Sequence, residues 1–170
     1  MLAKAMSAAL VGVEGRPVEV EVLSYGVIPE FETVGMAEKA VREARFRVRS
    51  AIRESGLPYP QTRVIVNLAP ADLRKDGTSF DLPVALGLLA ADKTIKQHSL
   101  DGWVIVGELA LSGEVRPVRG LLAVAEMARR LGMRGVICPL ANANEASALR
   151  GIEVRPAASL GDAVFALQGR

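Results

Sequence analysis

The stretch from residue 64 to residue 91 constrains the fold more than any other part of the sequence. Residues 64–68 form a short apolar, β-branched run of strand length, and residues 84–91 are apolar on almost every side of a helix. A helix of that kind has no polar face to turn toward water, so it belongs at the centre of the fold. Pro70 and Gly77 punctuate the loop between the two segments. We therefore predict a buried strand, a polar loop and a central core helix.

Charged side chains gather in this loop, directly before the helix. Asp72, Arg74, Lys75 and Asp76, which we call the charged loop, are two acids and two bases within five residues. They can bind a ligand or dock a neighbouring domain, or they can neutralise one another at the surface. Loops that lead into a helix N-terminus often carry function, so both interpretations stay open.

Ser79 lies between the strand and the helix, where a nucleophile would be well placed. A serine needs an adjacent base, and the sole histidine, His98, falls in a polar connector with no obvious partner. The preferred interpretation of Ser79 is therefore a helix N-cap, with Asp81 as the alternative cap. Pro83 fits the first turn of this helix, where its missing N–H has no partner in any case. We expect His98 to be a solvated loop residue.

A second candidate site is a stripe of arginines on the helix predicted over residues 37–55. Arg42, Arg45, Arg49 and Arg53 are spaced three and four apart, so they share a face beside the apolar one. Guanidinium groups in a row can bind the phosphates of a nucleic acid by bidentate hydrogen bonds, which releases the counterions condensed on its backbone. The stripe can also be a solvated helix face. Surfaces that bind single-stranded nucleic acid usually have aromatic residues between the basic ones, and no such residues alternate with these arginines. The acids that would balance it nearby are Glu38, Glu43 and Glu54.

Composition excludes several classes of protein. A chain with 50% hydrophobic and 24% charged residues is typical of soluble globular domains, and a net charge of +2 neither demands nor excludes nucleic acid. One histidine and one cysteine rule out the usual zinc site, and Cys138 is expected to be a buried structural thiol. The sequence has no P-loop, no dinucleotide-binding glycine motif and no apolar run of transmembrane length. We expect a cytoplasmic protein with no membrane contact, metal or cofactor of its own.

The rest of the chain reads as a run of strands, one helix and then alternating strands and helices. That order favours a single two-layer α+β domain over residues 1–170, with helices mainly on one face of a mixed sheet. The first part is a hairpin with a tight turn at residues 14–17. The predicted strands are 3–13, 18–23, 31–36, 103–109, 115–118, 135–139 and 152–155, and the further helices are 120–131, 142–149 and 159–167, the last capped by Ser159.

Several long motifs are specific enough to indicate a family. In one-letter code they are NLAPADL at 67–73, KDG at 75–77, FDLPVAL at 80–86, GELALSG at 107–113 and RPVRG at 116–120, with VG at 34–35, EKAVREAR at 38–45 and ANANEA at 141–146. They closely resemble the N-terminal domain of the ComM/YifB family. Its members are bacterial AAA+ ATPases similar to magnesium chelatase subunit I, linked to competence and to processing of transforming DNA.

This resemblance implies a fold, a missing module and a partner. The fold should be the Lon-protease-like, ribosomal-protein-type α/β domain with a left-handed βαβ crossover. In the family an AAA+ module holding ATP and magnesium follows this domain, so we expect this chain to be an N-terminal fragment of a larger ATPase. Full-length members look like hexameric motors that move branched DNA, which gives the arginine stripe a role in contacting single-stranded or branched DNA.

The same motifs resemble the protease domain of Lon, except at one catalytic position. Lon carries Lys-Asp-Gly-Pro-Ser with the serine as nucleophile, and this chain has a similar run that ends in Ser79. The catalytic lysine of Lon follows Gly-Gly-Leu, and the matching stretch here places Leu122 at the position of that lysine. Leucine cannot accept the serine proton, so the resemblance implies an incomplete Ser-Lys pair and no peptidase activity.

Our leading hypothesis is a non-catalytic N-terminal domain of a ComM-like AAA+ ATPase, serving assembly or DNA engagement. One alternative is a Lon-type serine peptidase that uses Ser79 with a different base. The other is a purely structural oligomerisation module, in which the arginine stripe pairs with acids of a neighbouring subunit.

Overall fold

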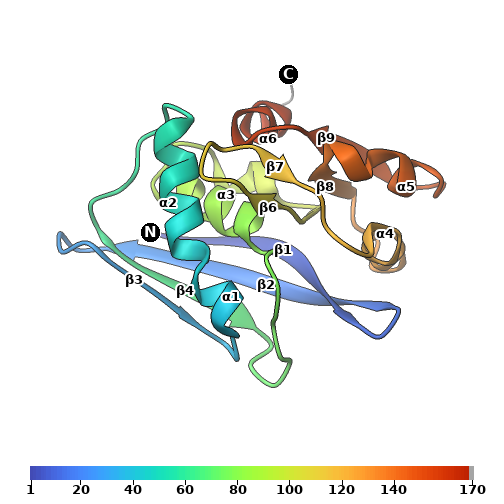
Figure 1. Cartoon of the computed structure of the whole chain (residues 1–170), viewed down its shortest axis with the longest axis horizontal. Helices are drawn as coiled ribbons and strands as arrows, with labels where there is room; N and C mark the ends of the chain where they lie inside the picture. The colour runs from blue at the N-terminus through green and yellow to red at the C-terminus, as the bar shows by residue number, and fades with distance from the viewer. Residues whose placement is uncertain (169–170) are drawn as a thin grey trace.

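A seven-stranded mixed sheet runs through the computed structural model, which describes residues 1–168 (Figure 1). Its order is β3-β4-β2-β1-β5-β8-β9, and β2 pairs antiparallel with β1 and β4 while the other neighbours are parallel. The strands are β1 (Leu2–Val11), β2 (Glu14–Tyr25), β3 (Glu30–Val34), β4 (Arg63–Ala69), β5 (Trp103–Ile105), β8 (Gly135–Pro139) and β9 (Glu153–Ala157). A separate two-stranded ribbon consists of β6 (Glu108–Leu109) and β7 (Val115–Arg116).

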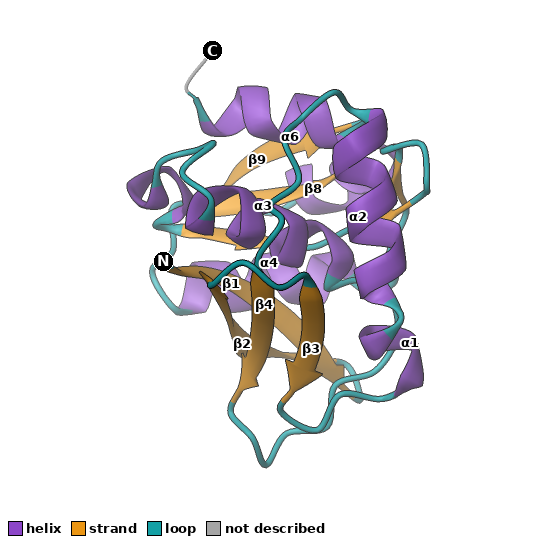
Figure 2. Cartoon of the chain, turned by 90° about the vertical axis from the view of Figure 1, so that its left-hand side faces the viewer, coloured by secondary structure: helices purple, strands orange, loops and turns teal. Residues whose placement is uncertain are grey.

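Helices cover both faces of this sheet. On one face, α3 packs on β1 and β2, and α2 packs on α3. On the other face, α4 packs against β2 and β8. Figure 2 shows α1 beside the edge strand β3, with α2 continuing away from it. The helices are α1 (Lys39–Arg42), α2 (Ala44–Glu54), α3 (Asp81–Ala91), α4 (Leu121–Arg130), α5 (Ala143–Ser147) and α6 (Leu160–Leu167), with 3₁₀ turns η1 (Gln97–Leu100) and η2 (Leu140–Asn142).

Two hydrophobic clusters, one on each face of the sheet, hold these helices in place. Successive side chains of β5 point to opposite faces, so Trp103 and Ile105 join the cluster that contains residues of α2, α3 and α6. Val104 joins the second cluster, which contains residues of α4 and α5. The α+β class with a mixed sheet is therefore confirmed, and the structure adds that α4 and α5 cover the second face.

The central helix is the part of the fold that the sequence predicted most directly. All eleven residues of α3 are buried. Gly87 allows α3 to approach the sheet closely, because a Cβ atom there would lie 2.8 Å from Cγ2 of Val22 on β2. The cap predicted for the last helix is also confirmed, since the Ser159 Oγ accepts a hydrogen bond from the backbone N–H of Asp162 at 3.1 Å.

Three local predictions were wrong. The turn expected at residues 14–17 lies at Gly12 and Val13 instead, because β1 and β2 stay paired as far as Val11 and Glu14. Gly12 has a φ of 64°, a left-handed conformation that suits glycine at a tight turn. The helix expected over 37–55 is interrupted at Glu43 between α1 and α2.

The third wrong prediction is the continuous strand expected over residues 103–109. The chain leaves the main sheet after β5, and Gly107 donates a hydrogen bond to the carbonyl oxygen of Ser79 instead of pairing along a strand. A Cβ atom at Gly107 would lie 2.9 Å from Cγ1 of Val115. This close approach brings the loop before α3 next to the β6–β7 ribbon.

Candidate functional site

The loop between β4 and α3 forms one wall of an open cleft of about 410 Å³. Residues 76–79 line the cleft from this loop, residues 8–10 from the end of β1 and residues 117–119 from the segment before α4. Ser79 is half-buried in the wall. The volume falls within the range of small-molecule sites, so a ligand has room to reach Ser79.

The described lining of this cleft has few ionisable side chains. Among the described residues that line it, the ionisable side chains are Arg74, Asp76 and Arg119, and none is a lysine or histidine. Leu122 is 44% exposed, and its backbone N–H donates to Oε1 of Glu145 at 3.2 Å. The described lining thus lacks the lysine of a Lon-type Ser-Lys pair and the histidine of a Ser-His pair, and Asp76 is its one carboxylate.

Ser79 and Asp81 do not cap α3, contrary to the sequence prediction. Phe80 occupies the N-cap position, and no side chain caps the first turn. The Asp81 carboxylate instead accepts hydrogen bonds from Arg47 Nε at 2.6 Å and Nη2 at 3.0 Å, and from the backbone N–H of Leu109 at 3.1 Å. This buried pair joins α2, α3 and β6 directly behind the cleft.

Burial dominates the electrostatics of this pair. It raises the pKa of Asp81 to about 6, against the hydrogen bonds from Arg47 and Leu109, which lower it. The hydrogen bond from Arg47 to Asp81 in turn raises the pKa of the guanidinium above its ordinary value. Sequence reasoning missed this pair, although one signal was available. Arg47 is three residues after Ala44 and four before Ala51, so it lies on the buried face of α2 rather than in the arginine stripe.

Lys75 of the charged loop is fully buried. Its Nζ donates to the carbonyl oxygen of Gly35 at 2.7 Å and to that of Pro70. Removal from water lowers the pKa of this ammonium group. Gly35 has a φ of 105°, and a side chain there would collide with the backbone of Leu68. Lys75 therefore ties the end of β3 to the loop that follows β4.

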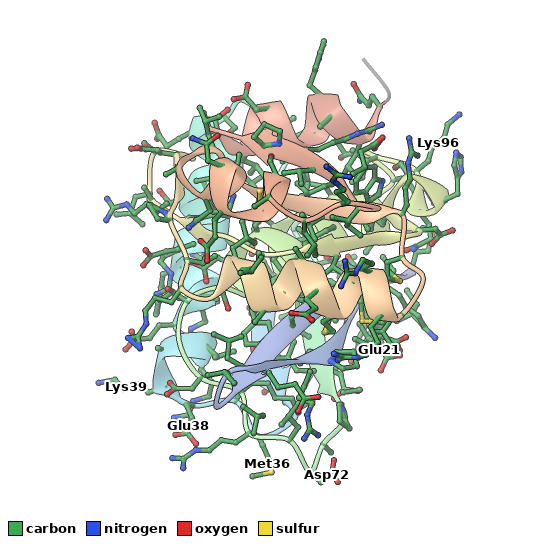
Figure 3. All side chains as sticks on the ribbon, turned by 90° about the vertical axis from the view of Figure 1, so that its right-hand side faces the viewer. Glu21, Met36, Glu38, Lys39, Asp72 and Lys96 are labelled. Carbon is green, nitrogen blue, oxygen red and sulfur yellow. The ribbon has the colours of Figure 1, made fainter. Side chains whose placement is uncertain are left out.

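The other residues of the charged loop face outward. Arg74 Nε lies 2.6 Å from Oε1 of Glu38, and Oδ1 of Asp76 accepts a hydrogen bond from the backbone N–H of Gly77 at 2.7 Å. Figure 3 shows Asp72 at the lower end of the molecule, where Met36 is also labelled, with Glu38 and Lys39 toward the lower left. Docking by Asp72, Arg74 and Asp76 stays a prediction, and the side chain of Lys75 is not available for it.

The arginine stripe forms an exposed surface that we call the arginine face, made of Arg42, Arg45, Arg49 and Arg53. Within residues 1–168 no carboxylate oxygen lies within 4.0 Å of these four guanidinium groups. Two acids expected to balance them pair elsewhere, because Glu38 contacts Arg74 and Glu43 contacts Lys39 at 3.8 Å. The positive charge of this face is therefore left to solvent and to any anionic partner.

Aromatic side chains lie against the arginine face, which corrects the sequence prediction. The Cζ of Arg45 is 4.7 Å from the ring centroid of Phe46, which is 53% exposed. Arg49 and Arg53 approach the ring of Tyr59, from the loop after α2, at 6.0 and 5.3 Å. Burial raises the pKa of Tyr59 while these two arginines oppose the rise, so its hydroxyl stays protonated at neutral pH.

The remaining candidates, His98 and Cys138, lie outside both candidate sites. His98 is exposed in η1, which confirms it as a solvated residue. Cys138 is fully buried, and burial raises the pKa of its thiol to about 12, so it is the structural thiol that was predicted. In the part of the chain that the structure describes, no three His, Cys, Asp or Glu side chains gather as metal ligands. Among residues 1–168, no helix is both long and apolar enough to cross a membrane.

Comparison with known proteins places these features in a family. A family model described as subunit ChlI of Mg-chelatase matches residues 18–142. Competence protein ComM of Haemophilus influenzae is 42% identical over 169 residues, which are 99% of this chain and 33% of that protein. The uncharacterized protein YifB of Escherichia coli is 43% identical over 143 residues, which are 84% of this chain and 28% of that protein.

A weaker similarity reaches the Lon proteases. The archaeal Lon protease of Methanocaldococcus jannaschii is 28% identical over 138 residues, or 76% of this chain and 21% of that protein. The chain spans about a third of the length of the ComM and YifB proteins that it matches. The resemblance to ComM and YifB is confirmed, and the chain belongs to the family of subunit ChlI of Mg-chelatase.

Proposed function

We propose that this chain is a non-catalytic domain of a ComM-like AAA+ ATPase and that it engages DNA through the arginine face. The observation that carries the proposal is a row of four exposed guanidinium groups without a carboxylate partner among the described residues. The similarity to a protein named competence protein ComM supports a role in handling DNA during transformation. ATP and magnesium belong to the AAA+ module of the parent protein, which we expect to act as a hexamer.

The arginine face has the physical properties of a phosphate-binding surface. A rise of 1.5 Å per residue separates Arg45 from Arg53 by about 12 Å along α2, so the surface can contact several phosphates in succession. Each phosphate that an arginine neutralises releases condensed counterions, which makes binding depend on salt. Such contacts are independent of sequence, as expected for a domain that works on DNA of any sequence.

The absence of a lysine or histidine from the described lining of the Ser79 cleft supports the non-catalytic part of the proposal. Leu122 stands at the position that resembles the Lon lysine, and the described lining of the cleft contains no other proton acceptor of that kind. A lone serine hydroxyl is a weak nucleophile at neutral pH.

The test is binding of the chain to fluorescent single-stranded, duplex and branched DNA across a salt series. The variant carries Arg42, Arg45, Arg49 and Arg53 changed to Ala. Its matched control changes four exposed arginines elsewhere to Ala, so that the net charge falls equally: Arg116, Arg119, Arg129 and Arg150. We expect binding to weaken with salt, to be lost in the first variant and to persist in the control. Equal loss in both variants would leave only an effect of net charge.

One observation favours a second candidate, a Lon-type serine peptidase. Ser79 lies in a cleft large enough for a peptide side chain. A serine-reactive phosphonate probe followed by peptide mapping distinguishes this candidate from the proposal. Labelling at Ser79 would favour the peptidase, whereas an unlabelled chain supports a non-catalytic domain.

A further inference from the structure

A small pocket of about 180 Å³ opens beside the C-terminal half of α2. Three segments that are distant in sequence line it. They are residues 29–31 at the start of β3, Arg49 and Arg53 of α2, and, before β4, Tyr59, Gln61 and Thr62. Sites for whole small molecules are typically about 300–1,000 Å³. A pocket below that range fits a single planar group rather than a complete cofactor.

Tyr59 is held rigidly in the wall of this pocket. It lies between Pro58 and Pro60, whose rings fix the backbone on either side, and its half-buried ring packs against the main hydrophobic cluster. The guanidinium groups of Arg49 and Arg53 lie 6.0 and 5.3 Å from the ring centroid. An aromatic ring and two guanidinium groups thus lie together in the wall of the pocket.

The polar groups of the pocket suit an anionic chain that carries flat polar rings. Glu30 is the single carboxylate among the described lining residues, and its Oε2 lies 3.3 Å from Nε of Arg63, outside the arginine face. Gln61 is exposed, and its amide offers both donors and an acceptor to the edge of a base. Thr62 is already engaged, because its Oγ1 shares a hydrogen bond with Oγ of Ser24 at 2.6 Å.

We propose that this pocket receives one unstacked base of single-stranded DNA, stacked against Tyr59 while the arginine face holds the neighbouring phosphates. The inference rests on the proposed function and names its substrate class. A base in a duplex is paired and stacked, so it enters such a pocket only after unpairing, which costs free energy. The site therefore prefers single-stranded DNA to duplex DNA with the same number of phosphates.

Substitution of Tyr59 tests this inference. We expect Tyr59→Leu to weaken binding of a single-stranded oligonucleotide on the order of tenfold, because the stacking surface is lost. Duplex binding at the same salt concentration should be unchanged, because the arginines remain. Tyr59→Phe keeps the ring and should bind like the original chain. Phe165→Leu, which removes an exposed aromatic ring of α6, is the control outside the pocket.

The outcomes separate this inference from the proposed function. Equal single-strand affinity of the original chain and Tyr59→Leu, with binding still lost in the four-arginine variant, would overturn the inference alone. Failure of both DNA forms to bind at low salt would overturn the proposed function and this inference with it.

A second measurement does not depend on the folding of a variant. The original chain is irradiated with a single-stranded oligonucleotide that contains 5-iodouracil, and the crosslinked residue is identified by mass spectrometry. We expect the crosslink at Tyr59. A crosslink at Phe46 alone, beside Arg45 in the other half of α2, or no crosslink at all would overturn the inference.

Discussion

The Ser79 cleft and the arginine face use charge in opposite ways. Three charged side chains close in sequence or space to the cleft loop bond inward, because Arg47 holds Asp81 and Lys75 bonds to two backbone carbonyl oxygens. The charged residues in the cleft lining itself, among them Arg74 and Asp76, are exposed. On the arginine face, four guanidinium groups are left to solvent or to the faces of aromatic rings. The inward bonds of Arg47, Asp81 and Lys75 thus hold elements of the fold together. The four arginines of the other region are exposed, and we propose that a binding partner meets their charge.

The largest expected effect contrasts two arginines of the same helix. Arg47→Met leaves Asp81 buried without its partner, and we expect the free energy of unfolding to fall by about 3–5 kcal/mol. Arg45→Met changes an exposed side chain two residues away and should cost less than about 0.5 kcal/mol. Urea unfolding of both variants measures the difference. Similar losses in the two variants would contradict the contrast between inward-facing and outward-facing charge.

The pH dependence of stability sharpens the account of the buried pair. Burial raises the pKa of Asp81 to about 6, whereas an unfolded aspartate titrates near about 3.9. The folded chain therefore holds this proton more tightly, and the resulting stability is present below about pH 4 and lost as the pH rises through about 6.

The measurement is the unfolding free energy of the original chain minus that of Asp81→Asn, at several pH values. We expect this difference to fall by about 2 kcal/mol between pH 4 and pH 7. A difference that rises with pH would mean that the hydrogen bonds from Arg47 lower the pKa of Asp81 more than burial raises it.

On the arginine face, the expected change is in binding and not in folding. Changing Arg42, Arg45, Arg49 and Arg53 to Ala should reduce the slope of log affinity against log salt by about 3, if each contacts one phosphate of a single strand. The thermal midpoint should stay close to that of the original chain, because all four side chains are exposed. A large loss of stability in this variant would show that the face takes part in the fold.

The smallest effect is expected at Ser79. Ser79→Ala should leave stability within about 0.5 kcal/mol, because the hydroxyl does not cap α3. Peptide hydrolysis should be equally absent before and after the change, measured with a fluorogenic peptide. Hydrolysis by the original chain that disappears in Ser79→Ala would favour the peptidase alternative. The Ser79 cleft would then be the functional region in place of the arginine face.

Much of the fold was predictable because it depends on local patterns. The apolar run of α3 required burial on every side, and the spacing of the arginines placed them on a common exposed surface. The errors fell where long-range contacts override local signals. The turn moved to Gly12 because strand pairing extended to Val11 and Glu14, and the predicted strand over 103–109 divided where Gly107 packs against Val115.

The sequence by itself determined the central helix, the mixed order of strands and helices, the arginine face and the replacement of the Lon lysine by Leu122. The first three follow from residue type and spacing, and the last is what the resemblance to Lon implies. Only the tertiary structure decided that Arg47 meets Asp81, that Lys75 is buried and that Tyr59 lies against Arg49 and Arg53. These contacts join separate segments of the chain. Helical spacing can place Arg47 on the buried face of its helix, but it cannot name the partner that meets it there.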